Sequence, residues 1–145
     1  MKREVIKNLL FTFGMFLLIF CFLPAKVKAT PEEDFSYVEK DGEITITGFK
    51  GAKDGGLTIP EKINGYPVTE IGSNAFSHSG IKGNLVIPDS VTAIGESAFD
   101  YCSYLTGDLI IPDSVKTIGE SAFSDCIGFT GQLQIGNNVT KIGRA

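Results

Sequence analysis

An internal repeat of 23 to 24 residues constrains this chain more than any other feature. The string IGSNAF begins at Ile71, and the string IGESAF begins at Ile94 and again at Ile118. A fourth copy begins at Ile142. Self-similarity at a fixed period of this length is typical of solenoids, in which a single unit cannot bury its apolar face and stacked units bury each other's.

Two further landmarks repeat in step with this string. A Leu-x-Ile segment has period 2 and predicts a short half-buried strand, which ends at a proline in three of its four copies. A Val-x-x-Ile pair then returns apolar side chains to the core. The Leu-x-Ile segments lie at 57–59, 85–87, 109–111 and 133–135, and the Val-x-x-Ile pairs at 68–71, 91–94, 115–118 and 139–142.

The glycine of each IG string predicts a chain reversal, followed by a short helical or 3₁₀ turn that buries an Ala-Phe pair. The phenylalanine is the largest apolar side chain of each unit, so we expect it to fill the core together with the isoleucine of the same string. The predicted repeat core is Phe76, Phe99, Phe123, Ile71, Ile94 and Ile118.

The combined pattern L-x-I-P-x-x-V-x-x-I-G-x-x-A-F-x-x-C resembles the BspA-like leucine-rich repeat, a bacterial surface subtype, from Leu57 to Gly143. The resemblance implies a curved, right-handed repeat solenoid on an exported protein, with short β-strands and short turns. It also implies adhesion to host matrix proteins, host cells or other microbes. We therefore expect a secreted or cell-surface bacterial protein, non-catalytic, whose partner is an extracellular protein or a host or matrix component.

Residues 1–29 are predicted to be a secretory signal peptide. A basic head over 1–8 precedes an apolar run from Leu9 to Leu23, and Val27-Lys28-Ala29 supplies the small residues of a cleavage site after Ala29. The alternative is an uncleaved membrane anchor, although a spanning helix needs about 20 apolar residues and this run is shorter. Contact with a membrane is expected only through this segment, if it stays uncleaved.

Residues 30–56 are predicted to form a polar leader and an N-terminal β-hairpin cap. Asp41-Gly42 lies between two strand-like segments, which is a strong hairpin signal. Residues 57–145 are predicted to be the leucine-rich-repeat array, with about three full units and a truncated fourth. The unfinished unit indicates either a shortened relative of longer arrays or an end that a partner covers.

The charge balance excludes nucleic acid as a partner. Removing residues 1–29 leaves 8 basic and 16 acidic residues, a net charge of about −8. A chain this acidic repels the phosphate backbone.

No catalytic or metal-binding constellation is predicted, and no cofactor. His78 is the single histidine and lies in a polar turn. Asp89 with Asp113, and Glu96 with Glu120, recur at the repeat period and could suggest calcium, but turns and helix starts account for these residue types.

Cys102 and Cys126 are 24 residues apart, so stacking places them on adjacent units. A disulfide is one interpretation, since adjacent units bring Cα atoms within bridging range. Packing of cysteine as a small apolar side chain is the other.

Binding would use solvent-facing positions between the core residues. The candidate ligand-binding residues are Thr58, Val86, Ile110 and Gln134 in one strand column, with Tyr101 and Tyr104 in a loop. A second outward column lies at 69–70, 92–93, 116–117 and 140–141. Val86 and Ile110 predict an apolar contact patch, although β-branched residues also favour strands for their own reasons.

Three functions stay open from the sequence. The first is a repeat protein that mediates protein–protein binding or adhesion. The second is a recognition module accessory to an extracellular hydrolase, and the third is a remnant array without its own ligand.

Overall fold

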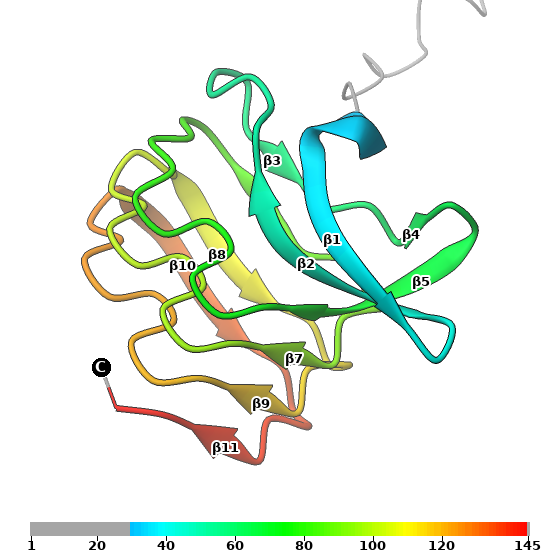
Figure 1. Cartoon of the computed structure of the whole chain (residues 1–145). Coiled ribbons are helices and arrows are strands. Elements are labelled where there is room, and N and C mark those ends of the chain that lie inside the picture. Colours follow the sequence, from blue (N-terminus) through cyan, green and yellow to red (C-terminus); the bar gives the residue numbers. More distant parts are fainter. Residues whose placement is uncertain (1–29, 145) are drawn as a thin grey trace, which may run out of the picture.

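The computed structural model describes residues 30–144. The predicted signal peptide with its cleavage position Ala29, and residue 145, lie outside these residues. The chain winds into a stack of coils, and short parallel strands form ladders along the stack (Figure 1). Among the described residues, no helix is long and apolar enough to cross a membrane.

The main ladder is built from the Val-x-x-Ile pairs. Its repeat strands are β5 (Tyr66–Ile71), β7 (Ala93–Ile94), β9 (Thr117–Ile118) and β11 (Lys141–Ile142). All neighbours pair parallel, and the isoleucines of the IG strings are register partners from one coil to the next. This register follows from the period, because the same residue of each unit meets its equivalent.

The Leu-x-Ile segments form the second ladder. Its strands are β3 (Leu57–Thr58), β6 (Leu85–Val86), β8 (Gly107–Ile111) and β10 (Phe129–Ile135). β3 pairs parallel with β6, and β8 pairs parallel with β10. A single bridge between Gly83 and Leu105 connects the two pairs.

An antiparallel hairpin begins the stack. β1 (Phe35–Lys40) and β2 (Glu43–Phe49) pair around Asp41 and Gly42, which both have positive φ, at 55° and 80°. β2 also pairs parallel with β5, so the hairpin adds a rung to the main ladder instead of closing the second one. A 3₁₀ helix at Glu32–Asp34 precedes β1.

The longer first unit contains a second hairpin. β4 (Lys62–Ile63) pairs antiparallel with the start of β5 around Asn64 and Gly65. Both turn residues have positive φ, at 51° and 85°, which is the geometry that Asn-Gly favours.

Three parallel phenylalanine rings run through the core. The ring centroids of Phe76 and Phe99 are 5.0 Å apart with planes at 4°, and those of Phe99 and Phe123 are 5.1 Å apart at 7°. Phe76 and Phe99 are fully buried, whereas Phe123 is half-buried. In the last described coil, Leu133 and Ile142 hold positions that are buried in earlier coils but are themselves exposed.

The segment after each IG string is made of β-turns and contains no helix. Hydrogen bonds from residue i to i−3 close these turns, for example from the Ser79 amide to the Phe76 carbonyl oxygen at 3.0 Å. The positive φ that the reversal needs falls on Asn74, Ser97 and Ser121, two residues after the glycine. The glycine serves a different purpose, because a Cβ on Gly95 would lie 2.6 Å from the Ser73 amide nitrogen of the preceding coil.

Candidate functional site

The structure places the four predicted strand-column residues on one face. Thr58 and Val86 are register partners on β3 and β6, and Ile110 and Gln134 are register partners on β8 and β10. All four alternate with buried leucine or isoleucine positions of the second ladder, so they point outward. Val86 is 47% exposed and Ile110 is 49% exposed. Two adjacent aliphatic side chains therefore form the centre of a column with polar ends.

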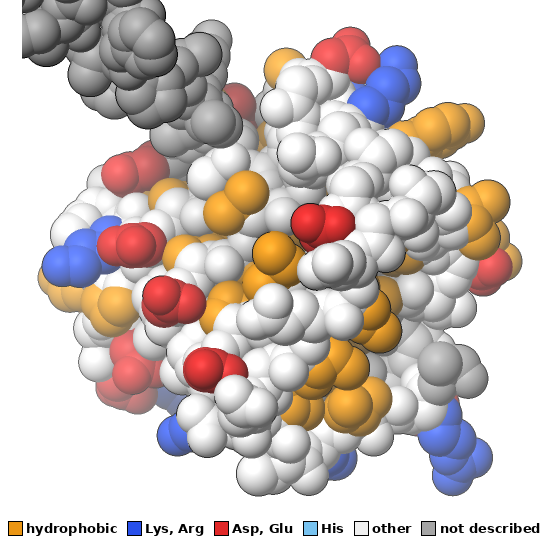
Figure 2. Space-filling model, turned by 180° about the vertical axis from the view of Figure 1, so that it is seen from behind, with side chains coloured by type: hydrophobic (Ala, Val, Ile, Leu, Met, Phe, Trp, Pro, Cys, Tyr) orange, Lys and Arg blue, Asp and Glu red, His pale blue; other side chains and the backbone are white. Residues whose placement is uncertain are grey.

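The face seen in Figure 2 lies on the far side of the view in Figure 1, where β8 and β10 are the more distant strands. Hydrophobic side chains run diagonally across it, and several acidic side chains gather toward one margin. This surface combines an apolar centre with a charged edge, an arrangement typical of protein contact surfaces.

A shallow groove at the N-terminal end of the strand column was not predicted. One hollow of about 350 Å³ is lined by Gly55, Gly56, Thr58, Gly83, Asn84 and Val86. A second hollow, of about 200 Å³, shares Gly55 and Gly56 and continues toward Thr30, Pro31 and Asp34. The glycines create the groove, because they leave the strand starts without side chains. The Gly-Gly pair at 55–56 is the sequence signal that could have indicated it.

Tyr101 and Tyr104 lie in the turn between β7 and β8 and not on the strand column. Both side chains are exposed. The ring of Tyr101 stacks on His78 of the preceding coil, with centroids 4.6 Å apart and planes at 11°. His78 is therefore an exposed turn residue that supports Tyr101, and the two tyrosines form a separate aromatic surface.

Cys102 and Cys126 are free thiols in the structure, so the disulfide interpretation is not realised there. The Cys102 thiol donates to the Phe76 carbonyl oxygen at 3.0 Å, and the Cys126 thiol donates to the Phe99 carbonyl oxygen at 3.0 Å. Burial raises the pKa of the Cys102 thiol. Burial, followed by the neighbouring Cys102, raises the pKa of Cys126 from 9.0 to about 12. At neutral pH both groups are protonated, which disfavours a nucleophilic role.

Two of the periodic carboxylates hold the following coil in place. The Asp113 Oδ1 atom accepts a hydrogen bond from the Asn137 amide at 2.7 Å, and the Asp108 Oδ1 atom accepts one from the Gln132 amide at 2.7 Å. Within residues 30–144, no group of three or more His, Cys, Asp or Glu side chains is arranged to hold a metal ion.

Stacked coils with two parallel strand ladders, a phenylalanine core and an outward strand column define a leucine-rich-repeat solenoid. The family model described as "BspA type Leucine rich repeat region (6 copies)" matches residues 55–145. The chain belongs to this family of BspA-type leucine-rich repeats.

Two solved structures resemble the chain. The leucine-rich-repeat protein of T. pallidum is 28% identical with a TM-score of 0.66, over 80% of this chain and 64% of that protein. A leucine-rich cell surface protein of Faecalibacterium prausnitzii A2-165 is 31% identical with a TM-score of 0.63, over 79% of this chain and 32% of that protein. The chain thus spans less than two thirds of the length of either. No curated protein matches it.

Proposed function

We propose that this chain is a secreted or cell-surface, non-catalytic repeat protein that binds an extracellular protein through the strand column. The family membership supports a repeat protein for protein–protein interaction, and one of the similar structures is described as a cell surface protein. The apolar run and cleavage pattern of residues 1–29 support export.

The adjacent exposure of Val86 and Ile110 carries the proposal. About half of each side chain remains in contact with water. Covering that half on binding would contribute about 1 kcal/mol per side chain. Strand propensity explains why β-branched residues occur here, but it gives no account of the glycine-lined groove that opens beside Val86. An apolar centre next to a groove fits a partner that presents a protruding segment.

The non-catalytic part of the proposal rests on the chemistry of the available groups. The two thiols have raised pKa values, and the single imidazole is stacked on Tyr101. Neither arrangement supplies an activated nucleophile with a neighbouring base.

Binding of the purified protein to an array of matrix proteins and glycans tests the proposal. We expect saturable binding to at least one matrix protein. The double variant Val86→Ser/Ile110→Ser should weaken that binding about 10- to 30-fold, which corresponds to the loss of about 2 kcal/mol. The control is Val38→Ser on the hairpin, because Val38 is 54% exposed but lies outside the column.

Two outcomes would contradict the proposal. Binding to polysaccharides alone would favour a module that serves an extracellular hydrolase. Equal losses from the column variant and from Val38→Ser would show that the strand column is not the contact surface.

A further inference from the structure

The outward face of the main ladder is a second surface, separate from the strand column of the proposed function. Five strands follow one another on it in the order β2, β5, β7, β9 and β11. This face, here called the ladder face, consists of the outward residues Glu43 and Thr45 on β2, Thr69 and Glu70 on β5, Thr92 and Ala93 on β7, Lys116 and Thr117 beside and on β9, and Thr140 and Lys141 beside and on β11.

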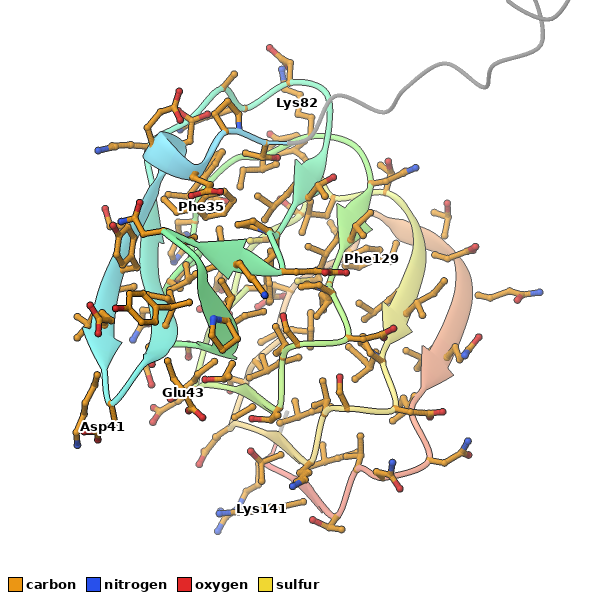
Figure 3. The ribbon with its side chains drawn as sticks, turned by 90° about the vertical axis from the view of Figure 1, so that its right-hand side faces the viewer. Phe35, Asp41, Glu43, Lys82, Phe129 and Lys141 are labelled. Atoms are coloured by element: carbon orange, nitrogen blue, oxygen red, sulfur yellow. The ribbon has the colours of Figure 1, made fainter. Side chains whose placement is uncertain are left out.

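The charges on the ladder face change sign about its middle strand. Glu43 and Glu70 lie on the two rungs at the hairpin end, whereas Lys116 and Lys141 lie on the two rungs at the other end. The rung between them, β7, carries only Thr92 and Ala93 outward. Figure 3 labels Glu43 and Lys141 along the same side of the stack, with Lys82 on the opposite side.

None of these four charges has an ion-pair partner among the described residues. Glu43 accepts a hydrogen bond from the Thr69 hydroxyl at 3.1 Å, and Glu70 accepts one from the Thr45 hydroxyl at 3.4 Å. The salt bridge found within residues 30–144 joins Lys82 to Asp54, outside the ladder face. Two acids and two bases therefore remain available to a partner.

We propose that the ladder face is a self-complementary surface on which two copies of this chain meet. A two-fold axis that runs along β7, in the plane between the copies, reverses the order of the rungs. It places β5 of one copy over β9 of the other and β2 over β11, so Glu70 faces Lys116 and Glu43 faces Lys141. Each contact occurs twice, as an isologous interface requires.

The middle of the ladder face permits close approach. Thr92, Ala93 and Thr117 are small side chains, and strands about 4.8 Å apart make a flat surface about 19 Å long. Such a face is smaller than the roughly 800 Å² per partner of a standard interface. Glu96 and Glu120, just beyond the ends of β7 and β9, add like charges at the rim, and Lys40 lies opposite Glu43 on β1. The expected dimer is therefore weak, with a Kd on the order of 10⁻⁴ to 10⁻³ M.

Sedimentation equilibrium of the purified protein and of two charge-reversed variants tests this assignment. Variant one is Glu43→Lys/Glu70→Lys, and variant two is Lys116→Glu/Lys141→Glu. Each variant alone places like charges on both sides of the axis, so we expect its self-association to weaken at least about 10-fold. In a one-to-one mixture all four contacts become attractive again, and we expect association within about 3-fold of the unmodified chain. The control Glu33→Lys/Glu61→Lys makes the same change in net charge outside the ladder face and should leave association unchanged.

The salt dependence gives a second measurement. Association of the unmodified chain should weaken between ionic strengths of about 0.02 M and about 0.5 M, because exposed charge pairs are screened. A chain that stays monomeric at about 1 mM and low salt would overturn the proposal. So would a dimer that both reversed variants form as well as the unmodified chain, or variants that do not associate when mixed although circular dichroism shows both folded.

Discussion

Replacing Phe99 by alanine tests whether the stacked phenylalanine rings hold the coils together. Phe99 is fully buried and has a parallel ring on each side, at 5.0 and 5.1 Å. Phe123 is half-buried and has one such neighbour among the described residues. The two side chains occupy equivalent repeat positions, so a comparison between them separates the effect of stacking from that of residue type.

The expected losses follow from burial. Truncating a fully buried phenylalanine costs about 3–5 kcal/mol, so we expect about 4 kcal/mol for Phe99→Ala. Phe123→Ala removes one stacked contact and leaves a cavity that is partly open to water, and we expect about 2 kcal/mol. With a urea m-value of about 2 kcal/mol/M, the unfolding midpoints should fall by about 2 M and about 1 M.

Urea titrations followed by far-UV circular dichroism and tyrosine fluorescence measure both changes, since the chain has four tyrosines and no tryptophan. Phe99→Leu, which keeps most of the volume and should cost less than about 1.5 kcal/mol, replaces the alanine variant if that variant does not fold. A loss at Phe99 no larger than the loss at Phe123 would refute the reasoning, because stability would not depend on the neighbouring coils.

Three further predictions concern other parts of the chain. Gly95→Ala should destabilise the fold by about 1–3 kcal/mol in thermal unfolding, because the added Cβ meets the Ser73 amide of the preceding coil at 2.6 Å, while a matched change at the open position Gly55 should avoid that clash. The raised pKa of Cys126 means that the unfolded chain loses this proton first as pH rises from 9.0 toward about 12, so the free energy of unfolding should fall over that range, and less steeply in Cys126→Ala; identical slopes would contradict the shift. Intact-mass spectrometry of the protein recovered from a bacterial culture medium should give a chain that begins at Thr30, and a full-length mass would contradict cleavage after Ala29.

Periodic residues made most of the fold predictable. The Leu-x-Ile and Val-x-x-Ile segments repeat at constant spacing, and equivalent residues pair from coil to coil as the spacing indicates. The strand column was predictable for the same reason, since an outward residue between two inward ones follows from the period of a strand. The core position of the phenylalanines follows from their size and their regular recurrence.

Features that depend on non-repeated contacts were not predictable. Nothing in the hairpin sequence specifies that Ile44 pairs with Val68 and Ile46 with Ile71, because a register shift separates these two pairs. The expected helical turn became β-turns with left-handed residues such as Ser97, since the close approach of the coils at Gly95 leaves no room for a helix. The groove at Gly55 and Gly56 depends on which side chains are missing, and apolar periodicity does not report that.

The regular register of the main ladder also bears on how such a chain can change length. The segment IGESAF occurs twice, 24 residues apart, with identical residues from Ile94 to Phe99 and from Ile118 to Phe123. A duplication or deletion between these two copies would add or remove one complete coil, and each coil packs mainly against its immediate neighbours.

Length can therefore change in steps of one rung, about 4.8 Å, while a change of one residue would disrupt the register of every following strand. One extra coil would lengthen the strand column by one position. It would also move the centre of the ladder face away from β7, so acids and bases would no longer be arranged symmetrically about a strand. Whether two chains match each other would then depend on the number of their coils as well as on the residues that the coils carry.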